Sequence, residues 1–160
     1  MSLHQLLHMS QDLVRFFNIL LAGLLAGSVF VIWAGYDPSA YPYETYVDQQ
    51  QGAIRGLNTL MPLMGFSTLL LTALSAYQQR DNRPVLITLV IAMVFMVGSA
   101  LTTRFGNQPI NAVVMTWDKA SPPQDWTILR DQWWSYHCLR AITTFCGFAL
   151  GIWSALRRAG

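Results

Sequence analysis

The sequence predicts an all-α membrane protein: an antiparallel four-helix transmembrane bundle capped by a structured outer loop at about residues 104–132. Three observations predict this fold. Four long apolar segments are separated by polar ones. Only 11% of the 160 residues are charged, against roughly 25% in soluble domains, and the mean hydropathy is +0.34. The segment before the last apolar stretch is too long for a mere connector. The length allows one domain, residues 1–160.

The expected spans are 14–34, 57–77, 85–103 and 134–156, each close to the roughly 20 residues that cross a bilayer. A short helix at 1–12 is expected to lie on the membrane surface before the first span. Residues 35–50, rich in tyrosine, proline and acid, are typical of an interfacial loop. Pro62 is expected to bend the second span. Pro109 is expected to open a short helix that runs through Trp117.

The two ends of the predicted bundle differ in charge. Arginines gather in the turn between the second and third spans and at the C-terminus, whereas acidic residues gather in the other two loops. By the positive-inside rule both termini are cytoplasmic, in what we expect to be a bacterial inner membrane, and the outer loop is extracytoplasmic. The arginines form no basic patch, so the sequence does not indicate nucleic-acid binding.

Small residues and cysteines have simple structural explanations. Cys138 and Cys146 lie on the same expected helix about 12 Å apart, too far for a disulfide. Two G-x-x-x-G faces allow helices to approach closely in lipid, either inside the monomer or against a second copy or a partner in a membrane complex. These faces are Gly23/Gly27 and Gly147/Gly151.

Polar and aromatic residues recur with four-three spacing on two of the expected helices, so each set shares one helix face. The fourth helix carries Trp126, Arg130, Trp133, His137 and Arg140, and the second carries Gln51, Arg55 and Asn58. We expect the two stripes to face each other beneath the outer loop, where they would form an extracytoplasmic pocket.

The same residues resemble the anthrone oxygenase-like family of small four-helix membrane proteins. The resemblance rests on the N-x-P-x-N element at 107–111, the W-D…P-P-x-D-W segment at 117–126 and the L-R-x-x-W-x-x-x-H-x-x-R run at 129–140. It implies the four-helix membrane fold and oxygenation of polyketide anthrones to anthraquinones without a metal or flavin. Lys119 stands where many members have proline, a departure that bears on loop shape.

Cofactor-free oxygenation needs a base that ionises the substrate, donors that stabilise the anion and an apolar cavity that admits oxygen. His137 is the candidate base, because a nearby guanidinium and a partly dry site favour the neutral imidazole. Arg140 is the candidate anion-stabilising group. The expected ligand is an aromatic, polyphenolic or quinol-like molecule. Candidate substrate-binding residues are Gln51, Arg55, Asn58, Asn107, Asn111, Trp117, Trp126 and Trp133.

Three alternatives stay open at this point. Arg140 can reach the interface and brace the loop, with His137 as a packing residue. The chain can be a non-enzymatic ligand-binding protein or an accessory subunit. A copper- or iron-dependent enzyme is the remaining alternative, although no metal or other cofactor is part of the main prediction. In that case His137 would bind the metal together with outer carboxylates, chosen from Glu44, Asp48, Asp118 and Asp125.

Overall fold

A computed structural model of the chain describes residues 2–157, which form helices and connecting turns. In chain order the elements are α1 (Leu3–Gly35), the short η1 (Pro38–Ala40), α2 (Tyr43–Leu57), α3 (Leu60–Gln78), α4 (Arg83–Thr102), the π-helical η2 (Thr103–Asn107), α5 (Gln108–Val114) and α6 (Trp126–Leu156). Within the described residues, four helical segments are long and apolar enough to cross a membrane. The predicted all-α membrane fold is confirmed.

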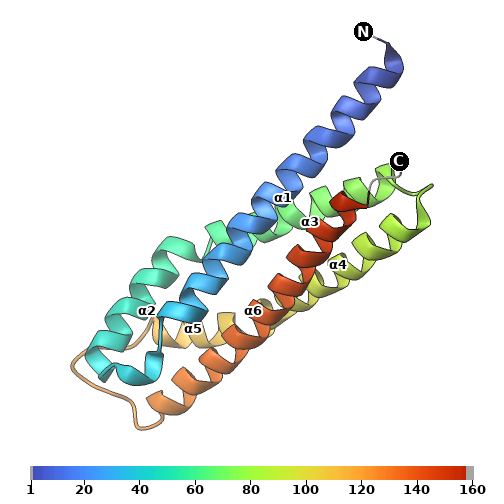
Figure 1. Cartoon of the computed structure of the whole chain (residues 1–160). Helices are drawn as coiled ribbons and strands as arrows, with labels where there is room; N and C mark the ends of the chain where they lie inside the picture. The colour runs from blue at the N-terminus through green and yellow to red at the C-terminus, as the bar shows by residue number, and fades with distance from the viewer. Residues whose placement is uncertain (1, 158–160) are drawn as a thin grey trace.

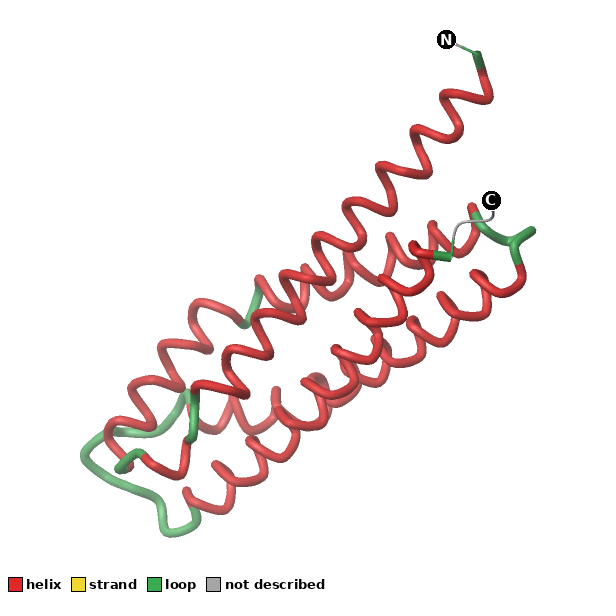
Figure 2. The backbone as a smooth tube through the Cα atoms, viewed as in Figure 1, coloured by secondary structure: helices red, strands yellow, loops and turns green. Residues whose placement is uncertain are grey.

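Each of the four long helices packs against two of the others. α1 packs against α3 and α6, and α4 packs against the same two helices. The start of α1, the α3–α4 turn and the end of α6 lie at one end of the bundle, while α2, η1 and α5 lie at the other (Figure 1). Figure 2 shows the long loop before α6 folded over that second end, which we call the cap end. The cytoplasmic location of the termini stays a prediction.

The first helix is longer than expected. α1 runs without interruption for 33 residues, about 50 Å, and its first turns extend past the rest of the bundle (Figure 1). The expected separate helix at 1–12 is therefore wrong within the described residues, because no glycine or proline interrupts the chain before Gly23. Residue 1 lies outside the described residues. Ser2 starts the helix with a reciprocal capping box to Gln5.

The second expected span, 57–77, corresponds to α3 (Leu60–Gln78), but the helix expected to carry Gln51, Arg55 and Asn58 into it divides in two. Residues 43–57 form α2 instead of continuing the expected interfacial loop, and the chain breaks at Asn58 and Thr59 before α3. Pro62 does not bend a continuous helix. It lies in the first turn of α3, where its missing N–H has no helical partner to lose. Its ring also disfavours a helical carbonyl at Asn58, four residues earlier. α2 therefore belongs to the cap.

The third span continues into the cap without a loop. α4 passes through η2 directly into α5, and Pro109 lies in the first turn of α5. The short helix expected from Pro109 is confirmed, although it ends at Val114 rather than Trp117. A Cβ added to Gly106 in η2 would lie 2.6 Å from the ring of Tyr136. The absence of a side chain at Gly106 therefore lets α6 pack directly against the π-helical turn.

In each G-x-x-x-G pair, the first glycine packs against another helix and the second does not. A Cβ at Gly23 would contact Phe148 at 3.4 Å, and one at Gly147 would lie 3.3 Å from the carbonyl oxygen of Ala92. Cβ atoms at Gly27 and Gly151 would meet no described atom within 4 Å. The first member of each pair thus serves packing inside the monomer, and a role of these faces in oligomers or membrane complexes stays a prediction.

Candidate functional site

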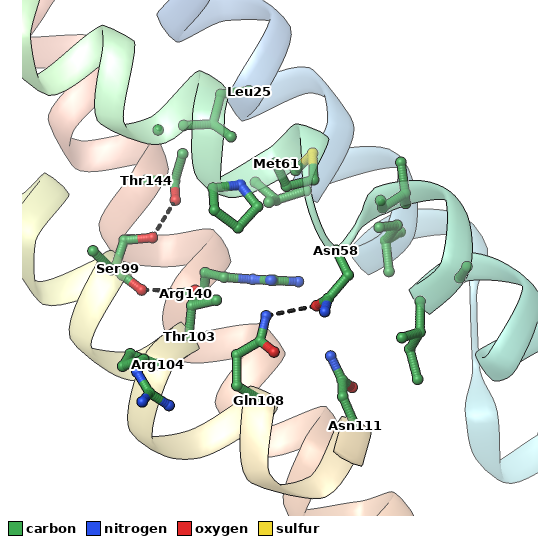
Figure 3. Close-up of a pocket in the computed structure, with 18 of the residues that line it drawn as sticks. Leu25, Asn58, Met61, Ser99, Thr103, Arg104, Gln108, Asn111, Arg140 and Thr144 are labelled. Carbon is green, nitrogen blue, oxygen red and sulfur yellow. Dashed lines mark hydrogen bonds between the residues drawn. The ribbon is translucent and has the colours of Figure 1, made fainter. Parts of the chain in front are cut away.

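A cavity of about 740 Å³ lies inside the bundle, beneath the cap. This volume falls in the range of roughly 300–1,000 Å³ that small-molecule sites occupy. Most of its wall is apolar, supplied by all four long helices and by α2. Figure 3 shows the polar groups that interrupt this wall. They include Asn58, Ser99, Arg104, Gln108, Asn111, Arg140 and Thr144.

Arg140 is the strongest electrostatic feature of the cavity. Its side chain extends from α6 toward Asn58 (Figure 3). Among the described residues, the side-chain ion pairs are Lys119–Asp48 and Arg130–Asp131, so Arg140 has no carboxylate partner. Its Nε is buried and makes no hydrogen bond there. An unpaired guanidinium facing an apolar chamber costs roughly 2.5–3.5 kcal/mol at membrane depth, and an anionic ligand would offset that cost.

His137 stands behind Arg140 rather than in the cavity wall. The imidazole is fully buried and lies stacked against Trp133 at 5.3 Å and Trp134 at 5.4 Å between ring centroids. Nη2 of Arg140 lies 2.6 Å from Nδ1 of His137. A guanidinium only donates hydrogen bonds, so Nδ1 accepts and the ring proton resides on Nε2. In this geometry His137 is neutral and holds the guanidinium in place.

Amide side chains line the opposite part of the cavity. Nε2 of Gln108 donates to Oδ1 of Asn58 at 2.6 Å, which joins the start of α5 to the α2–α3 break. Oδ1 of Asn111 accepts from Nε1 of Trp133 at 2.8 Å. Neither bond uses the Nδ2 group of Asn58 or Asn111, and no other hydrogen bond within residues 2–157 does so. Those N–H groups are available to a ligand oxygen.

The remaining predicted site residues divide between the cap and the surface. Gln51 is buried and donates to the carbonyls of Val114 and Trp117, each at 3.0 Å. Asn107 is buried and donates to the carbonyl of Trp133 at 3.0 Å. Trp117 and Trp126 pack with tyrosines of α2 in the cap, and Arg55 is exposed. Of the sequence-predicted set, the cavity wall therefore contains Asn58, Asn111, Trp133 and Arg140.

Sequence reasoning missed several polar residues of the wall, and two of them follow a recognisable pattern. Arg104 and Gln108 line the cavity together with Asn111, and these three residues repeat the four-three spacing that singled out the other two helices. Gln108 also lies inside the N-x-P-x-N element. The missed signal was a third polar stripe, hidden because the span was expected to end at residue 103.

The described residues contain no cluster of three or more histidine, cysteine, aspartate or glutamate side chains that could hold a metal ion. The outer carboxylates considered as partners of His137 do not gather around it. Asp48 pairs instead with Lys119, and the carboxylate of Asp118 accepts from the backbone N–H of Ala120 at 3.0 Å.

Fold and site together define a small integral membrane protein whose helix bundle contains a largely apolar cavity, lined by an arginine that has no carboxylate partner among the described residues. The chain belongs to the anthrone oxygenase family, since the family model described as Anthrone oxygenase matches residues 51–150. The matched region includes every polar cavity residue named above. No curated protein and no solved structure matches the chain.

Proposed function

We propose that the protein is a membrane-embedded, cofactor-independent oxygenase for a flat, weakly acidic aromatic molecule of the anthrone or polyphenol type. The observation that carries the proposal is the guanidinium of Arg140, which faces the apolar cavity without a carboxylate partner within residues 2–157. An aromatic enolate or phenolate supplies one anionic oxygen on an apolar body. The described residues supply no anionic group to Arg140, so such a ligand would provide it.

The proposed reaction can be written for anthrone itself. Removal of one proton from the methylene carbon gives the enolate, whose oxygen Arg140 stabilises with the amide groups of Asn58 and Asn111. The enolate gives one electron to O2, and the two resulting radicals join through a carbon–oxygen bond. The peroxide takes up a proton, and its O–O bond and the remaining C–H bond at that carbon then break to release water. Anthrone and O2 yield anthraquinone and water, so no external reductant is needed.

His137 enters this proposal in two separable roles. In the geometry described it positions Arg140 through Nδ1. The base role predicted from the sequence requires the same nitrogen, which becomes available when the guanidinium turns toward the substrate oxygen. Because Arg140 carries five N–H donors, it can bind the anion without leaving the pocket. His137 would then first hold Arg140 and afterwards accept the substrate's proton within one catalytic cycle.

The test uses purified protein in lipid nanodiscs with anthrone as substrate. Oxygen uptake and anthraquinone absorbance are recorded, and the spontaneous oxidation measured without protein is subtracted. Arg140→Met should lower the rate about 100-fold, as loss of a principal oxyanion donor does, without loss of folded protein. Arg83→Met is the matched control, because Arg83 is exposed at the opposite end of the bundle. A wild-type rate equal to the protein-free rate would overturn the proposal.

One observation favours a second candidate, a binding protein without catalysis. The histidine predicted as the base is absent from the cavity wall, and its Nδ1 is occupied by Arg140. The same nanodiscs distinguish the two functions. Anthrone that quenches tryptophan fluorescence through Trp133, with no oxygen uptake above the spontaneous rate, supports binding alone.

A further inference from the structure

The cavity wall includes exposed residues on both α3 and α4. Near their connecting turn these helices share a buried apolar cluster that includes Ala76 and Leu89. Closer to the cap, both helices present residues that line the cavity and are also exposed. Phe66 on α3 is 61% exposed, and Ala100 on α4 is exposed as well. Figure 3 looks into the cavity between these two helices.

One hydrogen bond crosses this opening at its cap end. It joins Gln108 to Asn58 at 2.6 Å, as the dashed line in Figure 3 shows. Both helical segments are irregular at this level, since α2 breaks from α3 at Asn58 and η2 is π-helical just before Gln108. Helix breaks and π-helical turns interrupt the regular backbone ladder, so the two sides can separate there without loss of intact helical turns.

The route from water passes the packed core of the cap. Above the cavity, Ile54, Ile110, Val114 and Trp133 form a buried apolar cluster. Gln51 adds two hydrogen bonds from α2 to the chain around Val114. A ligand arriving from the solution at the cap end would have to pass this layer or enter beside the exposed cavity residues Gln49 and Ala53 of α2. A ligand dissolved in the bilayer would meet the bond between Asn58 and Gln108 at the cap end of the opening between α3 and α4.

We propose that the opening between α3 and α4 is a lateral portal through which the substrate enters from the lipid, with Asn58 and Gln108 as its latch. The substrate class is then an uncharged, bilayer-soluble aromatic molecule that ionises only after it reaches Arg140. Its chemical type rests on the proposed function, whereas the entry route rests on the geometry alone. Arg104, exposed at the edge of the cavity, marks the polar side of the portal.

The test measures access and needs no catalysis. Cys138 and Cys146 are replaced by alanine, and Thr144, buried in the cavity wall, is changed to cysteine. Ser99→Cys serves as a second reporter if Thr144→Cys does not fold. In lipid vesicles, a bilayer-soluble maleimide should label this cysteine at least 10-fold faster than a membrane-impermeant sulfonate thiol reagent. Equal or faster labelling by the impermeant reagent would place the entrance on the water side and overturn the portal.

Two further substitutions locate the entrance. Ala100→Trp should slow labelling by the soluble maleimide at least 10-fold, because it fills the opening between α3 and α4. Ala53→Trp is the matched control, since Ala53 is an exposed cavity residue on α2, and it should leave the rate unchanged. Gln108→Leu should accelerate labelling by removing the latch. Slowing by Ala53→Trp and not by Ala100→Trp would overturn the assignment. A portal confirmed without anthrone oxidation would refute only the proposed function.

Discussion

The cap and the cavity are built from the same residue types, yet they use them in opposite ways. In the cap, Gln51 and Asn107 direct their amide N–H groups at backbone carbonyls and are buried. In the cavity, Asn58 and Asn111 use their side-chain oxygens and leave their N–H groups available. Arg140 likewise keeps a buried Nε without a partner among the described residues. Amide N–H groups are therefore used within the cap and stay available in the cavity, although Oδ1 of Asn107 and the hydroxyl of Tyr46 are buried in the cap without a partner among the described residues. Available donors in the cavity suit a ligand that accepts hydrogen bonds.

The aromatic residues divide along the same line. Trp117 and Trp126 pack with Tyr43 and Tyr46 in the cap. Burial raises the pKa of Tyr46, and the neighbouring hydroxyl of Tyr36 adds to this effect, so the phenol stays neutral in the cap. Trp133 belongs to both regions, because its ring lines the cavity while its Nε1 and carbonyl bind Asn111 and Asn107. It couples the position of the cap to that of His137.

The largest effect on stability should come from the cap. Gln51→Leu keeps the side-chain volume but removes the donor of the Trp117 carbonyl, whereas the carbonyl of Val114 still accepts from the N–H of Trp117. An unsatisfied buried carbonyl costs about 1–3 kcal/mol, so we expect the free energy of unfolding in detergent to fall by about 1–3 kcal/mol. Gln49→Leu is the matched control on the same helix. Gln49 is exposed, so its change should stay within about 0.5 kcal/mol. Equal losses of stability in the two variants would show that the hydrogen bonds of Gln51 do not stabilise the cap.

Two substitutions of His137 distinguish its role in holding Arg140 from its role as the base. His137→Ala removes both, and we expect the rate of anthrone oxidation to fall about 10–100-fold, equivalent to about 1.4–2.7 kcal/mol. His137→Asn keeps an oxygen near the position of Nδ1 that can accept from Arg140, but it cannot act as a base.

The pH profile distinguishes the outcomes. If His137 only positions Arg140, His137→Asn should recover most of the rate and keep the shape of the wild-type profile between pH 6 and 9. If His137 is the base, both variants should be equally slow and their rates should rise with pH as hydroxide replaces the imidazole. Wild-type rates in His137→Ala would exclude both roles.

The contact between η2 and α6, where the cap meets the cavity, should be sensitive to side-chain volume. Gly106→Ala places a Cβ against the ring of Tyr136, and such overpacking costs about 1–3 kcal/mol. Gly98→Ala on α4 is the matched control, because its Cβ would meet no described atom within 4 Å and alanine favours helix. Thermal unfolding should show a lower Tm for the first variant and an equal or higher Tm for the second. Adding Tyr136→Ala should restore the Gly106→Ala variant.

Features set by a single segment could be predicted from the sequence, whereas features set by contacts between distant segments could not. Apolar length predicted the four spans, because crossing a bilayer depends on one segment at a time. Four-three spacing placed Asn58 and Arg140 on helix faces that do line one cavity. The same spacing could not separate Gln51 from Asn58, since the difference lies in the carbonyls of Val114 and Trp117, more than sixty residues away. Which donors remain free is decided by tertiary contacts.

The smallest expected effect concerns the loop that closes the cap. Lys119 pairs with Asp48 on the surface, and this hydrogen bond and the attraction between the charges lower the pKa of Asp48 below its ordinary 3.8. A carboxyl group whose pKa is lower in the folded state stabilises that state above its unfolded pKa. This contribution disappears as the pH falls through the folded value.

Limited proteolysis of residues 115–125 measures the closure of this loop. Wild-type cleavage should increase on the acid side of pH 4, and added salt should increase it at neutral pH by screening the exposed pair. Asp48→Asn should show the higher cleavage already at neutral pH, with no further rise in acid or salt from this pair. Asp125→Asn, on the same loop and outside the ion pairs of the described residues, should behave as wild type. If all three proteins respond alike, Lys119 does not fasten the loop, and the cap is held by its buried hydrogen bonds alone.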